Sequence, residues 1–279
     1  MASFRSSWDG SWVAAGPDDS EKSPSRAGLR WLGHATTLIT DRDTHVLTDP
    51  VLTPRVAHLR RRRGLPPTGP RVLNPDVVLL SHLHADHTHL PSLRLIDEEA
   101  PIVVPRGAPD AVPALRALGH RLIEVRAGDT VGIGGVSIRA VPAAHDGRRW
   151  RRGPRSTAAL GYLVTGDKRT YFAGDTDLYP DLGDWVTDVD LALLPVGGWG
   201  PTLGEGHMDP YRAVQAAHTV AAKHSVPIHY GTLWPIGMDS VRPGMFFGPG
   251  AEFVRMARRE NLDVCELAPG EQLADQFGA

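Results

Sequence analysis

Short apolar runs, separated by turn-forming residues, follow one another along most of this chain. Such runs, bounded by Gly, Pro, Asn or Asp, are typical of buried or half-buried strands. The pattern predicts strands at residues 29–32, 37–40, 45–48, 77–80, 102–104, 122–125, 130–133, 136–141, 159–164, 170–173 and 191–194.

Two later segments have the spacing of amphipathic helices instead. In the first, residues 209–224, Asp209 is a suitable N-cap and Pro210 suits the first helical position. The second, residues 251–260, is expected to bury Phe253, Met256 and Ala257. Many strands with a few helices predict an α/β (α+β) fold of two packed sheets with helices outside.

Composition agrees with one large domain at residues 28–279. The chain has 279 residues, of which 41% are hydrophobic, enough for a substantial core. Residues 1–27 are rich in Ser, Gly, Pro and charge and predict a flexible arm. No apolar run approaches the ~20 residues of a membrane span, and no secretory signal is evident. The single cysteine suits a reducing compartment, so we expect a cytoplasmic protein.

The segment SHLHADHTHL holds the densest group of metal-ligand side chains. His82, His84, Asp86 and His87 follow the apolar run VVLL directly. Alternate residues of an extended strand exit point the same way, so His82 and His84 are placed to hold one ion. Asp86 and His87, further on, are placed to hold a second.

Three further candidate ligands follow predicted strands elsewhere. VSIRAVPAAH delivers His145, TYFAGDTD places Asp175 after an apolar run, and SVPIHYGT does the same for His229. Histidine nitrogen and carboxylate oxygen are ordinary zinc ligands. Each of these residues taken alone fits a structural role, but their common placement favours one shared site.

The order of these motifs resembles that of the metallo-β-lactamase-fold hydrolases. Within that superfamily it resembles the branch of N-acylphosphatidylethanolamine-hydrolysing phospholipase D and L-ascorbate-6-phosphate lactonase. The matching segments are RWLGHATTLI, LTDPVLTPR, NPDVVLLSHLHADH, YFAGDTD, LALLPVGGWG, GHMDPYRAV and PIHYGT. The resemblance implies a four-layer αββα sandwich.

The resemblance also implies a site with two divalent metal ions, zinc first, with manganese or iron as alternatives. The first ion would be held by His82, His84 and His145. The second would be held by Asp86, His87 and His229, and Asp175 would bridge both. Such a pair lowers the pKa of a bridging water, so that hydroxide is available for hydrolysis at neutral pH.

Other residues are candidates for supporting roles. By resemblance, Asp49 would lie beneath the metal site, although a turn aspartate before proline fits equally well. Asp86 could also orient the hydroxide or carry a proton. His34 follows a strand and could line the site or hydrogen-bond a ligand. His207 is the candidate for an oxyanion-stabilising or proton-donating group, and the alternative is that it caps loop backbone.

Two arginine runs bear on the substrate. One is Arg60–Arg63, and the other includes Arg148 and Arg149 directly after His145. Guanidinium groups match phosphate and carboxylate geometry, so Arg148 and Arg149 favour an anionic substrate, with Trp199 as an apolar wall.

Three classes of function follow. The first is a metal-dependent hydrolase acting on a phosphodiester, ester or lactone of a small or lipid-like molecule. The second is a nuclease of the same fold, against which the net charge of −2 argues. The third is an iron redox or regulatory use of the scaffold. The oligomeric state is left open.

Overall fold

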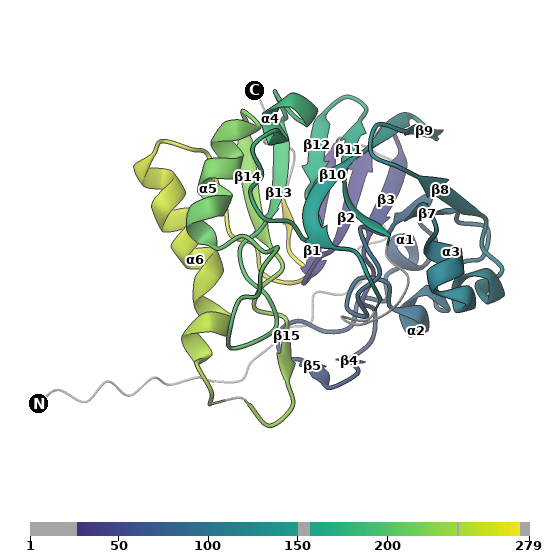
Figure 1. Ribbon diagram of the computed structural model, residues 1–279, viewed down its shortest axis with the longest axis horizontal. Coiled ribbons are helices and arrows are strands. Elements are labelled where there is room, and N and C mark those ends of the chain that lie inside the picture. The colour runs from purple at the N-terminus through teal and green to yellow at the C-terminus, as the bar shows by residue number, and fades with distance from the viewer. Residues whose placement is uncertain (1–26, 150–156, 239, 274–279) are drawn as a thin grey trace, which may run out of the picture.

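The computed structural model describes residues 27–149, 157–238 and 240–273. Two large sheets pack face to face and helices cover both outer faces, which gives four layers (Figure 1). The predicted αββα sandwich is therefore confirmed. The predicted arm falls almost wholly on residues outside the described ranges, and the division into an arm and one domain stays a prediction.

The first sheet has seven strands in the order β16-β1-β2-β3-β6-β7-β8. β3, β6, β7 and β8 are parallel neighbours, and the other pairs are antiparallel. Its strands are β1 (Gly28–Gly33), β2 (Thr36–Asp41), β3 (Thr44–Thr48), β6 (Val77–Leu79), β7 (Ile102–Pro105), β8 (Leu122–Val125) and β16 (Gln272–Leu273).

The second sheet has six strands in the order β14-β13-β12-β11-β10-β9. β12, β13 and β14 are parallel, and β10 runs in the same direction because β11 is antiparallel to both β10 and β12. Its strands are β9 (Thr130–Ile133), β10 (Val136–Asp146), β11 (Ala158–Thr165), β12 (Arg169–Phe172), β13 (Leu191–Pro195) and β14 (His224–Ile228).

A small third sheet joins distant parts of the sequence. It pairs β5 (Leu59–Arg61) with β4 (Arg55–Val56) and with β15 (Leu233–Pro235). This sheet lies below the carboxyl ends of the large sheets in Figure 1.

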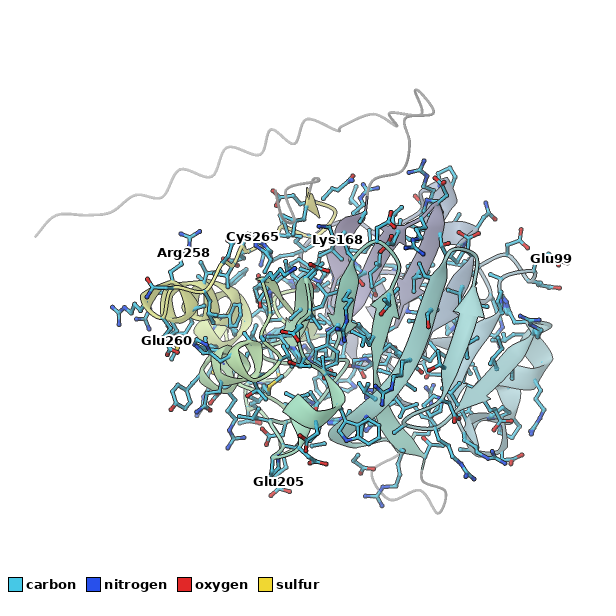
Figure 2. All side chains as sticks on the ribbon, turned by 90° about the horizontal axis from the view of Figure 1, so that it is seen from above. Glu99, Lys168, Glu205, Arg258, Glu260 and Cys265 are labelled. Atoms are coloured by element: carbon cyan, nitrogen blue, oxygen red, sulfur yellow. The ribbon has the colours of Figure 1, made fainter. Side chains whose placement is uncertain are left out.

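The helices divide between the two outer faces. The two long helices α5 and α6 pack together beside β13 and β14, and the short helix α4 contacts α5 and β10. The other short helices pack on the first sheet. The helices are α1 (Pro70–Leu73), α2 (Leu90–Leu93), α3 (Ala108–Ala111), the 3₁₀ helix η1 (Pro113–Leu118), α4 (Leu182–Trp185), α5 (Pro210–Thr219) and α6 (Pro243–Arg259). Figure 2 shows Arg258 and Glu260, at the end of α6, pointing away from the sheets.

The core follows the alternation of strand side chains. Val77 and Leu79 of β6 belong to the cluster between the sheets, while Val78 belongs to the cluster under the short helices. β6 is therefore apolar on both faces, as a central parallel strand requires. This burial fixes the direction in which the chain leaves the strand towards His82.

Element boundaries differ from the predictions mainly in the helices. Asp209 caps α5 as predicted by accepting from the Arg212 amide, but the helix ends at Thr219. α6 begins at Pro243, eight residues before the predicted start, and includes Pro249. Phe246 and Pro249 are both buried, and Phe246 packs on Trp234 at 5.1 Å between ring centroids.

Candidate metal centre

The predicted ligands all lie where strands end. His82 to His87 follow β6, His145 is the penultimate residue of β10, Asp175 follows β12 and His229 follows β14 directly. Because β10, β12 and β14 run in one direction, their carboxyl ends meet at one edge of the second sheet. The fold therefore brings together all seven side chains that the sequence singled out.

One group of these ligands, called the outer set here, consists of His82, His84 and His145. The distance between His82 Nε2 and His84 Nδ1 is 2.9 Å, and that between His145 Nε2 and His84 Nδ1 is 3.2 Å. His82 is buried, whereas His84 and His145 are half-buried. Three imidazole nitrogens thus converge near the surface.

The other group, the inner set, consists of Asp86, His87 and His229, which are all buried. The Nε2 atoms of His87 and His229 are 3.2 Å apart, and they lie 3.6 Å and 3.9 Å from Asp86 Oδ2. The structure thus brings together the three residues predicted to hold the second ion.

Asp175 lies between the two sets. Its Oδ2 is 3.2 Å from His87 Nε2, 3.9 Å from His82 Nε2 and 4.0 Å from His145 Nε2. Its Oδ1 is 3.1 Å from His229 Nε2, yet within the described residues this buried oxygen has no hydrogen-bond partner. A buried carboxylate oxygen in this state has strong affinity for a cation.

The other ring nitrogens are held by acceptors outside the centre. His145 Nδ1 donates to the Gly206 carbonyl at 2.7 Å, and His229 Nδ1 donates to the Gly197 carbonyl at 3.0 Å. A carbonyl oxygen only accepts, so each Nδ1 carries the proton and each Nε2 of the neutral ring has a free lone pair. Such outer partners are usual for histidines that bind metals.

Asp49 and Ser81 hold the Nδ1 atoms of His87 and His82 in the same way. Asp49 Oδ2 accepts from His87 Nδ1 at 2.7 Å and from Ser81 Oγ at 2.5 Å. Since Ser81 donates its proton to Asp49, its oxygen is left to accept from His82 Nδ1 at 2.9 Å. Asp49 therefore lies beneath the site, the first of its two predicted alternatives.

Protonation also fits cation binding. Burial lowers the pKa of His82 well below its usual value and that of His84 to about 4, so both rings are neutral at pH 7. Burial also acts on His87, but the charges of Asp175 and Asp86 outweigh it and raise the pKa of His87. The inner set thus favours positive charge at its centre.

The donor set fits two divalent ions. Ligand atoms of His82, His84 and His145 lie within 4.8 Å of one another, and so do those of His34 with the inner set. Several ring nitrogens lie about 3 Å from one another, close enough for a shared cation to bind between them. Nitrogen and carboxylate oxygen suit zinc. Ligation by each residue stays a prediction.

Three residues of the centre have left-handed backbone: His34 (φ 56°), Asp49 (φ 34°) and His229 (φ 62°). Such residues cost on the order of 1–3 kcal/mol and persist where their surroundings hold them. The His34 carbonyl accepts from Trp31 Nε1 and from the His229 amide. These contacts link two of the turns that aim side chains at the centre.

His34 and His207 each contact a carboxylate of the centre. His34 Nε2 is 2.8 Å from Asp86 Oδ2, so it contacts a predicted ligand. His207 Nε2 is 3.4 Å from Asp175 Oδ2, and its side chain is 21% exposed. Burial acts to lower the pKa of His207, but the hydrogen bond and charge of Asp175 raise it above the usual value.

The arginines take positions that the sequence did not indicate. Arg148 pairs with Asp146 at 2.7 Å, and Arg149 Nη1 donates to the backbone carbonyls of Leu83 and Thr88. Arg61, in the first run, is buried and donates to the backbone carbonyls of Leu32 and Val51. Arg151, Arg152 and Arg155 lie outside the described residues.

Two further positions complete the comparison with the sequence. Trp199 is half-buried and packs edge-on against His58 at 5.2 Å, next to the small third sheet. Ser81 was missed, although its place directly before His82 was a signal. Gly174 belongs with Ser81: its φ is +62°, and an added Cβ would lie 2.7 Å from the Ser81 side chain.

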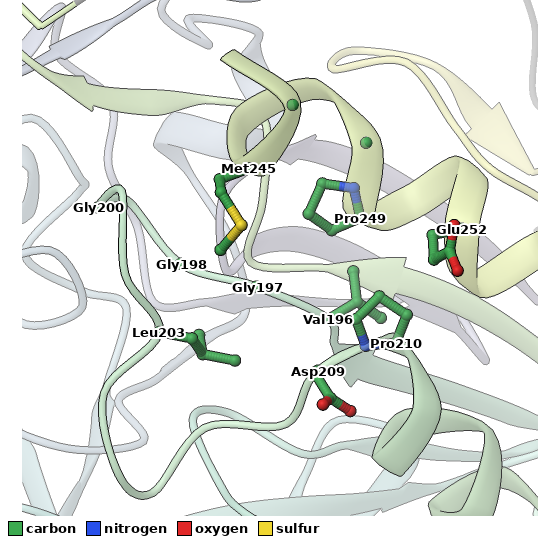
Figure 3. Close-up of a pocket in the computed structure, with 12 residues that line it drawn as sticks. Val196, Gly197, Gly198, Gly200, Leu203, Asp209, Pro210, Met245, Pro249 and Glu252 are labelled. Atoms are coloured by element: carbon green, nitrogen blue, oxygen red, sulfur yellow. The ribbon is translucent and has the colours of Figure 1, made fainter. Parts of the chain in front are cut away.

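An apolar cavity of about 300 Å³ lies between the loop that joins β13 to α5 and the first half of α6. Figure 3 shows Leu203 of this loop and Met245 of α6 on opposite sides of the cavity. Gly197, whose carbonyl accepts from His229, lines it as well. One loop therefore contributes both to the cavity wall and to the support of a candidate ligand.

The described helices include no segment with the length and apolar character needed to cross a membrane.

Comparison with known families identifies the chain. The family model described as the β-lactamase superfamily domain matches residues 44–230, more than half of the sequence. The chain therefore belongs to the β-lactamase superfamily, and the predicted superfamily is confirmed.

Individual proteins are more distant. A UPF0173 metal-dependent hydrolase of Thermus thermophilus is 29% identical over 249 residues, which cover 88% of this chain and 97% of that protein. N-acyl-phosphatidylethanolamine-hydrolyzing phospholipase D 1 of Caenorhabditis elegans is 29% identical over 242 residues, 76% of this chain and 66% of that protein. The solved structure of Igni18, a metallo hydrolase of Ignicoccus hospitalis, has the same fold, with a TM-score of 0.65 and 22% identity; the match covers 88% of this chain and 97% of Igni18.

Proposed function

We propose that this protein is a dinuclear metal-dependent hydrolase. It would cleave a phosphodiester, ester or lactone bond in an anionic small or lipid-like substrate. The observation that carries the proposal is the convergence of the outer and inner sets on the buried carboxylate of Asp175. Relatives named as metal-dependent hydrolases support the reaction type.

The ligands divide as their distances suggest. His82, His84 and His145 would hold one ion, Asp86, His87 and His229 the other, and Asp175 would contact both. When bound, zinc ions supply a water of lowered pKa and polarise the bond to be cleaved. Two dications carry more positive charge than the carboxylates Asp86 and Asp175 cancel, which favours an anionic substrate.

The chain's own groups then orient the reactants and move protons. Asp86 accepts a hydrogen bond from His34, which limits rotation of its carboxylate. His207 Nδ1 lies 3.1–3.2 Å from the carbonyls of Glu205 and Gly204, so its Nδ1 proton is held there. In the protonated ring, Nε2 carries the second proton, and we assign to it the protonation of the leaving group.

The apolar cavity supports a lipid-like substrate. Its walls are mainly apolar, and it adjoins the loop that supports His229. The phospholipase D relative acts, by its name, on an N-acylated phospholipid. We propose that the apolar part of the substrate occupies this cavity while the scissile bond lies at the metals.

Metal content and turnover test the function together. The purified protein is expected to bind two zinc ions per chain by elemental analysis. It should hydrolyse at least one member of a panel of phosphodiesters, acyl esters and lactones. Asp86→Asn keeps the size of the side chain and should lose most of this activity. Two bound irons with oxygen consumption and no hydrolysis would refute the proposal.

A further inference from the structure

One irregular segment, His82–Thr88, carries four of the seven proposed ligands between β6 and α2. Inside it, the amides of His87 and Thr88 donate to the His84 carbonyl. Thr88 Oγ1 donates to the His82 carbonyl at 2.7 Å. These bonds close the turn, while the carbonyls of Leu83 and Thr88 accept from elsewhere in the chain.

The donor to both carbonyls is Arg149. Its Nη1 lies 3.0 Å from the Leu83 carbonyl oxygen and 2.6 Å from that of Thr88. The Leu83 amide in turn donates to the Gly147 carbonyl at 3.3 Å, two residues before Arg149. Leu83 and Thr88 are fully buried, so water is a poor substitute for the guanidinium.

We propose that Arg149 is a positioning residue for the metal centre, because a single nitrogen holds the two ends of the segment that contains His84, Asp86 and His87. The inference rests on the proposed function for its consequence in metal binding. Its structural part, the restraint of the loop, is independent of any metal.

The neighbouring arginine shows that the position is specific. Arg148 places Nε and Nη2 on the carboxylate of Asp146, and both side chains are more than one third exposed. Burial lowers the pKa of Arg149, while the negative charge of Asp86 acts to raise it, which places this cation within electrostatic reach of a proposed ligand. Arg149 is therefore distinguished from Arg148 by its two backbone acceptors in the ligand-bearing segment.

Arg116 offers a matched control far from the centre. Its Nη1 also donates to a backbone carbonyl, that of Pro109, and its Nη2 contacts Asp110. The variants Arg149→Met and Arg116→Met each remove such a donor and keep an unbranched apolar side chain. Arg149→Lys keeps a cationic donor nitrogen at this position.

Two measurements separate the loop from the metal. Amide hydrogen exchange at residues 84–88 of the metal-free protein should be at least about tenfold faster in Arg149→Met. Its zinc affinity, measured by chelator competition, should fall about 10- to 100-fold. Arg149→Lys should recover most of both losses, and Arg116→Met should leave both at wild-type values.

Wild-type exchange and affinity in Arg149→Met would overturn the proposal. Should that variant fail to fold, Arg149→Gln, whose shorter amide does not reach both carbonyls, is judged by the same two values. Equal losses in Arg116→Met would also overturn it, because the effect would then be general. If the wild-type protein binds no zinc but its amide exchange at residues 84–88 is still slower than that of Arg149→Met, the metal centre alone is refuted.

Discussion

The two halves of the candidate metal centre use the same imidazole chemistry in different surroundings. In the outer set, the nearest carboxylate oxygen of Asp175 is 3.9–4.0 Å from His82 and His145. In the inner set, His87 has Asp175 at 3.2 Å, Asp86 at 3.6 Å and Asp49 on its other nitrogen. The inner set is also the more deeply buried.

This difference assigns a task to each half. Coulombic attraction grows as distance and effective dielectric constant fall, so the inner set is expected to bind its cation more strongly. The outer set includes half-buried rings and adjoins His207, the partly exposed group of the centre. We therefore expect the inner ion to be retained and the outer ion to exchange and meet the substrate first.

The largest effect is expected where the halves meet. Asp175→Ala removes the carboxylate that contacts both sets, so both ions should be lost and turnover should fall by at least about 10³-fold. Elemental analysis and initial rates measure this. Asp177→Ala, which removes an exposed ion pair with Arg212, is the control and should keep both ions. Retention of one tightly held ion in Asp175→Ala would show that the halves are independent.

A smaller loss is expected from His207→Gln, which should keep both ions and lower turnover by about 10²-fold. The pKa of His207 is raised, so its donor form is present at pH 6.5 and is lost as pH rises through that higher value. Wild-type activity should therefore decline on the alkaline side, and the variant should lack this limb. Identical pH profiles from pH 6 to 10 would remove His207 from the proton transfer.

The comparison itself is tested by a pair of single substitutions. His145→Ala should leave the inner ion, and His229→Ala should leave the outer one. Because the inner set has more carboxylate charge, the ion left in His145→Ala should bind about tenfold more tightly than the ion left in His229→Ala. Chelator competition gives both affinities. The reverse order of affinities would mean that the desolvation cost of burying the inner ion exceeds its attraction to the carboxylates.

The smallest effect on the chemistry is expected from a change that leaves both sets intact. An added Cβ at Gly248 would meet open space, and Gly248 lines the cavity. Gly248→Leu should lower kcat/KM for long-chain acyl substrates about tenfold while short-chain turnover and metal content stay unchanged. Gly132→Leu in β9, an equally open position outside the cavity lining, is the control. Equal loss for both chain lengths would refute the cavity's role.

Much of the centre could be read from the sequence because ligand and strand signals coincide there. An apolar run stopped by a histidine or aspartate marked His82, His145, Asp175 and His229, and the structure brings these residues together. Apolar runs locate strands well because a central strand buries both faces.

The remaining features depend on contacts between residues far apart in sequence. Ser81 donates to Asp49 and accepts from His82. Both contacts depend on β3 and β6 being neighbours in the sheet. The arginine run does not reveal that Arg61 is buried, because its place in the fold depends on the pairing of β5 with β15. Strands as short as β4, with two residues, have no pattern to detect.

The long separation of the ligands along the chain has a consequence for biogenesis. His87 and His229 are 142 positions apart yet their Nε2 atoms are 3.2 Å apart. A nascent chain whose last strands are still unsynthesised has the amino-terminal ligands but not the inner set. Loading of the inner ion is therefore expected to follow completion of β14, because this ion stabilises only those molecules in which the long loop is closed.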